Sequence, residues 1–331
     1  MAPSVSVLIN NHNYARFLGE AIDSVLSQED CPTPEVVVVD DGSDDDSRAV
    51  VESYGARVRG VFQPRRGQTA AVNRGFAESG GEVVFLLDAD DAWRPGKISR
   101  VLAEFADPAV GAVQHLLHDS DAALNPLPRR FPRWPARYRL EDLLAGRVEW
   151  TAVSGTAFRR EILARALPLP EEMFFYLDDW MLSRALFFGE VANVPETLAL
   201  RRVHGANWYA GAFGDVKKLE ADLANRAIYR RALDAWLGER GLTLSPAAAE
   251  TERLELSRRK ILLDGLRGRP AAALREWRAG LPAAARSPHA LFRAATTLLA
   301  ALWPSLYLAL YRAYGAGPWR AWRQALFPER A

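Results

Sequence analysis

The segment that most constrains the fold is an apolar run, Val83 to Leu87, followed at once by the carboxylates Asp88, Asp90 and Asp91. The run is uncharged and rich in β-branched and aromatic residues, which is typical of a strand buried on both faces of a parallel sheet. Ligands of open α/β sheets bind beyond the carboxyl ends of the strands. Carboxylates placed there could hold a hard divalent cation such as Mg²⁺. A solvated acidic turn that caps the next helix explains the same residues equally well.

Two further apolar runs predict neighbouring strands of the same sheet. Residues 5–9 end in the polar run Asn10 to Tyr14, and residues 36–39 end in Asp40 and Asp41. Helical patterns separate these strands at a spacing that indicates βαβ units and a mainly parallel sheet. Since no G-x-G-x-x-G sequence follows the first strand, dinucleotide binding is disfavoured.

Composition excludes several classes of protein. The 331 residues are 49% hydrophobic and 25% charged, which suits two or three modules with a real core. A net charge of +1 argues against a nucleic-acid partner held by bulk electrostatics. The single cysteine, Cys31, excludes an intrachain disulfide framework and a multi-cysteine metal site. We expect a cytoplasmic protein, because the N-terminal apolar run is too short for a signal peptide and lacks a basic flank.

The second half of the chain changes in character. Strands are expected at residues 110–117 and 198–203, and the Pro- and Arg-rich residues 124–139 look like an inserted loop. From residue 215 onward strand patterns vanish, and the sequence predicts helices at 215–240, 246–267 and 270–280. We therefore expect an all-helical C-terminal region.

The run 294–311 contains no charged residue and has three explanations. Its length is just short of the ~20 residues that span a bilayer. Trp303 and the later Arg312 suit a helix that lies in the membrane interface. A helix packed against the rest of the protein or against a partner explains the run as well. Pro304 removes a helical hydrogen bond within the run, so we expect a bend there.

Five short sequences, in this order, resemble the motifs of a family 2 glycosyltransferase. They are Val5–Tyr14 with Ser24–Gln28, Val39–Ser43, Gly67–Glu82 leading into Asp88–Asp91, Tyr176–Trp180, and Arg201–Asn207. Each is weak alone, but with five in register the chain is identified as a member of that family over about residues 4–210.

The resemblance implies an α/β fold of the GT-A type with a mainly parallel central sheet, followed by a C-terminal all-helical extension. Residues 1–112 would form the half that binds the nucleotide-sugar, and residues 113–212 the half that binds the acceptor. Residues 213–331 would be the helical region, which has no counterpart in the minimal family core.

The resemblance also assigns roles to individual side chains. Metal ligands for Mn²⁺ or Mg²⁺ are expected at Asp88, Asp90, Asp91 and His204. Contacts with the nucleotide are expected at Asn11, Asn13, Asp41, Arg66, Asp88 and Ala89. Contacts with the acceptor are expected at Gly155, Trp180 and Trp208.

Catalysis is expected at the acidic pair Asp178 and Asp179. Asp179 is the expected base that takes the proton of the acceptor hydroxyl, while Asp178, where the family usually has Glu, would cap the helix, orient the base or contact the acceptor. Simpler explanations stay open: a helix N-cap for Asp179, a turn for Asp41, a structural histidine for His204, a solvated loop for Arg66, and core packing for the two tryptophans.

The function implied is that of an inverting glycosyltransferase, which moves a sugar from UDP or dTDP to a hydroxyl. The acceptor would be a glycan, a lipid-linked molecule or a small molecule in bacterial polysaccharide or glycoconjugate synthesis. The alternative is a nucleotide-sugar-binding or scaffold protein of the same fold without turnover. The C-terminal helices would bring the enzyme to the cytoplasmic face of a membrane or mediate oligomerisation.

Overall fold

The computed structural model describes residues 2–128, 131–205, 207, 214–284 and 288–315, and the chain forms two compact units. The first unit comprises Met1–Asn207 and Ile228–Leu244. The second unit comprises Trp208–Ala227 and Ser245–Ala331. The expected domain boundaries at residues 112 and 213 stay predictions.

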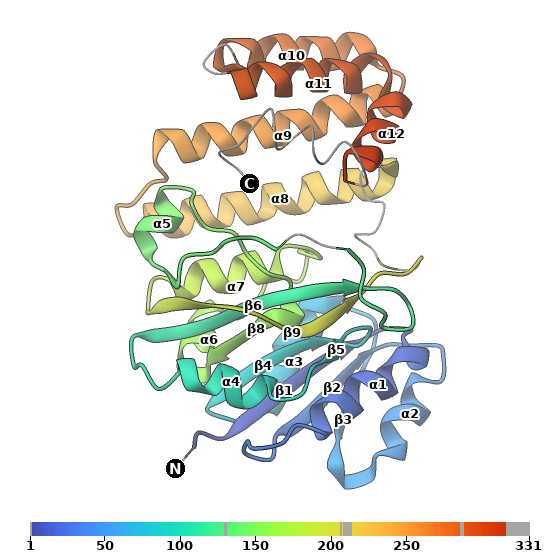
Figure 1. The fold of residues 1–331 in the computed structure, drawn as a ribbon, viewed down its shortest axis with the longest axis vertical. Helices are drawn as coiled ribbons and strands as arrows, with labels where there is room; N and C mark the ends of the chain where they lie inside the picture. The colour runs from blue at the N-terminus through green and yellow to red at the C-terminus, as the bar shows by residue number, and fades with distance from the viewer. Residues whose placement is uncertain (1, 129–130, 206, 208–213, 285–287, 316–331) are drawn as a thin grey trace. The chain divides into compact units, whose positions relative to one another are not determined.

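A mixed β-sheet forms the centre of the first unit, with neighbours in the order β3-β2-β1-β4-β8-β6-β9-β5 and with β7 on β9 (Figure 1). The first four strands in this order are parallel to one another: β1 (Val5–Asn11), β2 (Glu35–Asp41), β3 (Arg59–Gln63) and β4 (Val83–Asp88). Their register places Asn11 opposite Asp40 and Asn10 opposite Asp88. The polar ends of these strands therefore meet at one edge of the sheet, as the sequence predicts.

The rest of the sheet is not purely parallel. Strand β8 (Thr156–Arg159) runs antiparallel to both β4 and β6 (Val110–Ser120), whereas β6 and β9 (Glu190–Arg202) are parallel. The short strands β5 (Ala92–Trp93) and β7 (Arg137–Tyr138) pair antiparallel with β9. The expected loop 124–139 thus contributes a strand at its end, and β9 begins eight residues before the expected strand at Leu198.

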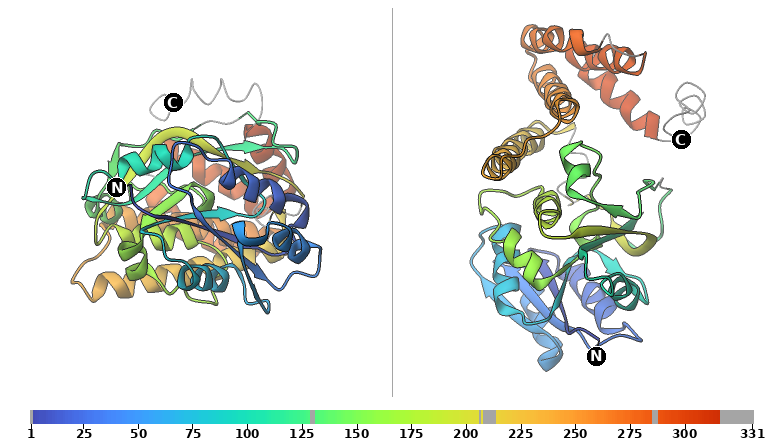
Figure 2. Two further views of the ribbon diagram at one scale, coloured as in Figure 1. Left: turned by 90° about the horizontal axis from the view of Figure 1, so that it is seen from below. Right: turned by 90° about the vertical axis from the view of Figure 1, so that its left-hand side faces the viewer.

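Side chains of β4 alternate between two hydrophobic cores, one on each face of the sheet. Phe85 and Leu87 pack with α1, α2 and α4, and Val84 and Leu86 pack with α3, α6 and α7. Helices consequently cover both faces (Figure 2). These helices, with α5 and two short 3₁₀ helices, are α1 (Ala15–Leu26), α2 (Ser47–Ser53), η1 (Gly55–Arg57), α3 (Gln68–Glu78), α4 (Lys97–Glu104), α5 (Leu140–Leu144), η2 (Val153–Gly155), α6 (Arg160–Ala166) and α7 (Leu177–Ala185). The prediction that Val83 to Leu87 is buried on both faces is confirmed.

The second unit is helical throughout its described residues, as the sequence predicts. Its helices are α8 (Val216–Gly238), whose second half belongs to the first unit, α9 (Pro246–Leu266), α10 (Pro270–Ala284), α11 (Pro288–Leu302) and α12 (Pro304–Gly315). A small core of apolar residues from α8, α9, α10, α11 and α12 holds them together. Gly265 of α9 faces the carbonyl of Ala300 so closely that a Cβ atom would clash, so this glycine permits α9 and α11 to pack tightly.

The uncharged run 294–311 is divided at Pro304, as expected. Helix α11 ends at Leu302 and α12 starts with Pro304, whose missing N–H is harmless at the first helical position. Part of the run is core, because Ala300, Ala301 and Tyr307 are buried. Part is exposed, in a set comprising Leu302, Trp303, Leu306 and Leu310. Among the described residues, no helix has both the length and the apolar character needed to cross a membrane.

Candidate functional site

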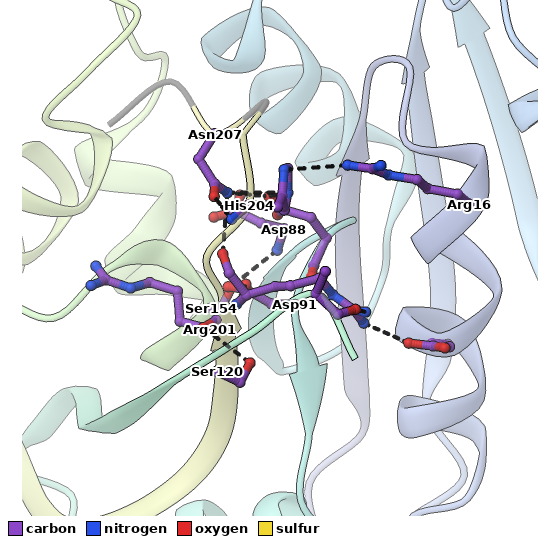
Figure 3. Close-up of polar contacts among 12 residues, drawn as sticks. Arg16, Asp88, Asp91, Ser120, Ser154, Arg201, His204 and Asn207 are labelled. Carbon is purple, nitrogen blue, oxygen red and sulfur yellow. Dashed lines mark hydrogen bonds and ion pairs between the residues drawn. The ribbon is translucent and has the colours of Figure 1, made fainter. Parts of the chain in front are cut away.

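Three carboxylates gather where β4 ends, and Figure 3 shows two of them, Asp88 and Asp91, together with His204 and Asn207. One oxygen from each of Asp88, Asp90 and Asp91 lies within 4.8 Å of the others. Burial, and then the charge of Asp88, raises the pKa of Asp90 to about 7. Burial, and then the charges of Asp90 and Asp88, raises the pKa of Asp91 well above its usual value. Carboxylates that are this close and this buried repel one another, and a bound divalent cation would relieve the repulsion.

Asp88 has one carboxylate oxygen held by the protein and one open. Asn10 on β1 and Gln68 at the start of α3 both donate to its Oδ1, at 3.0 and 2.7 Å. Its backbone N–H donates to the hydroxyl of Ser154 at 3.1 Å. Within the part of the chain that the structure describes, no group donates a hydrogen bond to Asp88 Oδ2. The carboxylate is thus fixed in direction while one oxygen stays available to a ligand.

Asp90 forms hydrogen bonds with three residues from the end of β9 and the turn after it. Arg202 Nε donates to the Asp90 carbonyl at 2.7 Å. His204 Nε2 and Asn207 Nδ2 both reach Asp90 Oδ2, at 3.1 and 2.9 Å. Asn207 Oδ1 also accepts the backbone N–H of His204, which closes the turn. Arg202 at the end of β9, and His204 and Asn207 in the turn after it, therefore orient Asp90.

His204 lies against the rings of Tyr14 and Phe17, with ring centroids 5.7 and 4.9 Å away. Its Nδ1 is 3.4 Å from the guanidinium of Arg16. Burial, and then the charges of Arg16 and Arg202, lowers the pKa of His204. The lowered pKa favours the neutral imidazole, which is the form that can offer a lone pair to a metal ion.

Asp91 differs from its two neighbours because both of its oxygens are occupied. Ser154 Oγ donates to Oδ2 at 2.5 Å, and the backbone N–H of Arg202 donates to Oδ1 at 2.9 Å. Asp91 lies near enough to share a metal ion with Asp88 and Asp90. Its contacts show, however, that it joins the acidic turn to β9 and to the loop at Ser154.

Asp41, at the end of β2, accepts three hydrogen bonds. Gln63 Nε2 and the N–H of Arg66 donate to its Oδ1 at 2.7 and 2.8 Å, and the N–H of Gly67 donates to its Oδ2 at 2.7 Å. A carboxylate has about four acceptor positions, so one position remains for a ligand. The turn role that the sequence left open for Asp41 is filled by Asp40 instead, which accepts the N–H of Ser43 at 3.0 Å.

The asparagines of the first motif tie β1 to β2. Asn11 Nδ2 donates to Asp40 Oδ2 at 2.7 Å, and Asn13 Oδ1 accepts the N–H of Asp44 at 2.9 Å. The Oδ1 atoms of Asn10 and Asn11 are buried without a hydrogen-bond partner among the described residues. Buried acceptors of this kind call for a donor, and both lie where β1 ends.

Two expected nucleotide contacts are placed differently from what the sequence suggests. Arg66 turns its guanidinium to Glu171, with Nη2 2.6 Å from Oε1 and Nε 3.2 Å from Oε2. The two side chains are 56% and 46% exposed, and the contact of Arg66 with the nucleotide stays a prediction. Ala89 is buried and donates its N–H to the carbonyl of Asn10 at 3.2 Å. Arg66 and Ala89 therefore support the site through the backbone.

The acidic pair begins α7, directly after Tyr176, whose φ of 67° is left-handed. Asp178 is half-buried, and burial, followed by the charges of Asp179 and, more weakly, of Asp88, raises its pKa well above the usual value. Asp178 is therefore close enough to the acidic cluster to sense its charge. The hydroxyl of Ser183 donates to the Asp179 carbonyl and lies 2.8 Å from the hydroxyl of Tyr229, which fixes α7 against α8 within the first unit.

Two of the three expected acceptor contacts, Trp180 and Gly155, lie among the described residues, and both are buried. Trp180 is a core residue: its indole N–H donates to the Ala166 carbonyl at 2.8 Å, and Arg184 lies 3.7 Å over its ring. With only 5% of its surface exposed, Trp180 fits the core-packing explanation that the sequence left open, and its contact with an acceptor sugar stays a prediction. Gly155 is buried where a Cβ atom would meet Thr151 Oγ1 at 2.7 Å, so it serves close packing. Trp208 lies outside the described residues.

Comparison with known proteins decides the family. Residues 6–167 match the sequence profile of glycosyl transferase family 2. The chain is also 36% identical over 229 residues to an uncharacterized glycosyltransferase of Nostoc sp. (strain PCC 7120), covering 66% of this chain and 70% of that protein. The chain belongs to glycosyl transferase family 2. Family 2 membership confirms the resemblance seen in the sequence.

Other relatives of this family 2 glycosyltransferase agree. It is 34% identical over 201 residues to the succinoglycan biosynthesis protein ExoU of Rhizobium meliloti, covering 56% of this chain and 54% of ExoU. Its fold is similar to the mannosyltransferase PcManGT from Pyrobaculum calidifontis, solved with GDP-Man and Mn²⁺, with a TM-score of 0.56, 22% identity and coverage of 92% and 88% of the two chains. It is also similar to residues 1–349 of S. aureus TarS, solved with UDP-GlcNAc, with a TM-score of 0.51, 16% identity and coverage of 79% and 80%. These likenesses confirm the expected GT-A fold.

Several residues that hold the site of this glycosyltransferase had no assigned role from the sequence. Ser154 connects Asp88 to Asp91, and the fully buried Lys97 donates from Nζ to the Ser154 carbonyl at 2.7 Å while lying 3.8 Å from the centroid of the Trp93 ring. Nothing in the local sequence marks Ser154 or Lys97. Arg202 and Asn207 could have been found, because they stand with His204 in the closing motif.

Proposed function

We propose that the protein is an inverting, metal-dependent glycosyltransferase that moves a sugar from UDP or dTDP to a hydroxyl acceptor. The observation that carries the proposal is the meeting of Asp88, Asp90 and His204 at the same sheet edge as Asp41. A metal-binding group and a base-reading group at one edge are what a nucleoside diphosphate requires. The structural relatives solved with GDP-Man and Mn²⁺ and with UDP-GlcNAc support this class of donor.

The residues present fit a divalent metal ion. Asp88 has an open Oδ2, Asp90 is oriented by the turn after β9, and neutral His204 offers a lone pair. Mn²⁺ or Mg²⁺ held by these side chains would supply positive charge against the diphosphate that leaves. Asp91 would assist by keeping the acidic turn in place through Ser154 and Arg202.

The nucleotide would lie across the ends of β1 and β2. Asp41 keeps one acceptor position, which suits the ring N–H of a uracil or thymine base. The unpaired Oδ1 atoms of Asn10 and Asn11 would accept hydrogen bonds from hydroxyls of the donor. Asn13 accepts a hydrogen bond from the N–H of Asp44 and so fixes the loop after β2, over which the nucleotide would pass.

The acceptor hydroxyl would lose its proton to Asp179 as its oxygen attacks the anomeric carbon. The new C–O bond forms on the face opposite the departing diphosphate oxygen, so the configuration inverts. Asp178, whose raised pKa favours the protonated form, is suited to donate a hydrogen bond to the acceptor rather than to take its proton. Asp179, which stands where the family motif has its base, would then take the proton.

The acceptor would be a growing polysaccharide or a lipid-linked sugar, in line with the name of ExoU. The exposed set Leu302, Trp303, Leu306 and Leu310 lies at the α11–α12 junction and on α12, where Leu306 and Leu310 are four residues apart. Apolar residues so spaced, with Trp303 61% exposed, suit shallow insertion into a membrane surface. The enzyme would then work at the cytoplasmic face of a membrane.

A thermal-shift screen tests the donor class, because a ligand that binds only the native state raises its stability. UDP, dTDP, GDP and the corresponding sugars are compared with Mn²⁺ and with EDTA. We expect uridine or thymidine diphosphates to raise the unfolding temperature only with Mn²⁺, and transfer to a hydroxyl acceptor to need the metal. Binding without any transfer or donor hydrolysis would favour the scaffold alternative, and no binding at all would contradict the proposal.

A further inference from the structure

The segment between α6 and α7 presents one aromatic ring to the outside. Phe174 is 52% exposed, whereas its neighbours Met173 and Phe175 are 0% and 7% exposed. The two buried neighbours anchor the backbone in the core, so the ring between them is directed outward. Single exposed apolar side chains are common on protein surfaces, so the location of this ring decides what it can do.

The ring of Phe174 lies against the loop that Asp41 holds. A Cβ atom on Gly67 would be 3.0 Å from Phe174 Cε1, which places the edge of the ring on the Gly67 backbone. The N–H of Gly67 donates to Asp41 Oδ2 at 2.7 Å. A single residue, Gly67, thus separates an exposed aromatic ring from the carboxylate that retains an acceptor position.

Two polar connections fix the segment that carries Phe174 to α3 and its preceding loop. Arg66 pairs with Glu171 through two nitrogen atoms, at 2.6 and 3.2 Å. Asn73 on α3 forms reciprocal hydrogen bonds with the backbone of Leu169, at 2.8 and 2.9 Å. A ring held in this way loses little conformational freedom when a ligand binds.

We propose that Phe174 is the stacking platform for the nucleobase of the donor, an inference that rests on the proposed function. Asp41 would accept the ring N–H of the base at its edge, while Phe174 would cover a flat face. An aromatic ring also suits the apolar face of an acceptor sugar, but its contact with Gly67 beside Asp41 favours the base. Phe174 would then raise affinity for the nucleoside part of the donor and contribute nothing to the diphosphate.

Isothermal titration of the full chain in Mn²⁺ separates these two parts of the ligand. UDP and inorganic pyrophosphate are titrated into the wild type, Phe174→Ala, Phe174→Trp and Phe131→Ala. Phe131 is the matched control, because it is 37% exposed in the same unit and packs edge-on against His118. Removing a base-stacking ring typically weakens binding about five- to 150-fold.

We expect Phe174→Ala to weaken UDP binding by that factor and to leave pyrophosphate affinity unchanged. Phe174→Trp should keep UDP affinity within about threefold, since a larger ring still stacks, and Phe131→Ala should match the wild type. Equal losses for UDP and pyrophosphate, or unchanged UDP affinity together with a raised KM for the acceptor, would overturn the inference alone. If the wild type bound neither UDP nor another nucleoside diphosphate, the proposed function would fail with it.

Discussion

The replacement Arg202→Met tests how the acidic turn is held. Arg202 ends β9 and is 2% exposed. Its guanidinium donates to the carbonyls of Asp90 and Ala122, at 2.7 and 2.5 Å, and to the carboxylate of Glu20 at 2.6 Å. It also lies 4.2 Å from the centroid of the Phe17 ring. Methionine keeps the apolar stem of the side chain but removes every one of these donors.

The size of the effect follows from these contacts. A hydrogen bond that involves a charged group contributes about 1.5–3 kcal/mol. The Asp90 carbonyl loses its donor in a buried place, and the Ala122 carbonyl loses its donor in a half-buried one. Because the Glu20 side chain is 57% exposed, that ion pair contributes only about 0–1 kcal/mol. Methionine in turn removes the cost of burying a guanidinium, which offsets part of the loss. We expect the free energy of unfolding of the first unit to fall by about 3–5 kcal/mol.

Arg201→Met is the matched control, since Arg201 is the preceding residue of the same strand. Its side chain is 40% exposed and pairs with Asp119 at 2.7 Å, so its loss should cost only about 0–1 kcal/mol. Urea unfolding followed by tryptophan fluorescence measures both variants, with the m-value as a check that the same surface unfolds. Equal losses for the two variants, or a loss below about 1 kcal/mol for Arg202→Met, would refute this account of the buried guanidinium.

Three further outcomes are expected. Asp90→Asn should raise the Mn²⁺ concentration for half-maximal transfer at least about tenfold, and full activity of this variant in EDTA would contradict a metal site. Asp179→Asn should lower kcat by about 10²–10⁴ while UDP affinity stays unchanged in calorimetry, so a kcat within about threefold of the wild type would exclude Asp179 as the base. The triple variant Trp303→Ser, Leu306→Ser, Leu310→Ser should lose co-sedimentation with anionic liposomes, and equal sedimentation with the wild type would leave these residues without a membrane role.

The parallel half of the sheet could be predicted because its evidence is local. Strands β1, β2 and β4 are short apolar runs, and each ends in polar residues that reach the same edge. The other half could not, because β8 pairs antiparallel with two partners distant in sequence. Pro195 marks a strand boundary in most contexts, yet β9 continues through it, where its register against β6 shifts.

The site shows the same division between local and distant information. The position of Asp88, Asp90 and Asp91 follows from the strand before them, and the structure brings these residues together as expected. Whether Arg66 meets a phosphate or a carboxylate depends on Glu171, which is 105 residues away. The orientation of Trp180 likewise depends on its hydrogen bond to the Ala166 carbonyl, a contact that the local sequence does not reveal.

The spacing of the closing motif has a direct physical reason. Arg202 is the last residue of β9, so its backbone N–H still reaches Asp91 while its guanidinium reaches the carbonyl of Asp90. His204 and Asn207 follow in a turn that their own contact closes, and both then point at one oxygen of Asp90. Loss of Asn207 would therefore release His204 as well as Asp90. His204 and Asn207 contact each other and the same oxygen of Asp90. The losses in free energy of unfolding that single changes at these two residues cause should therefore not add.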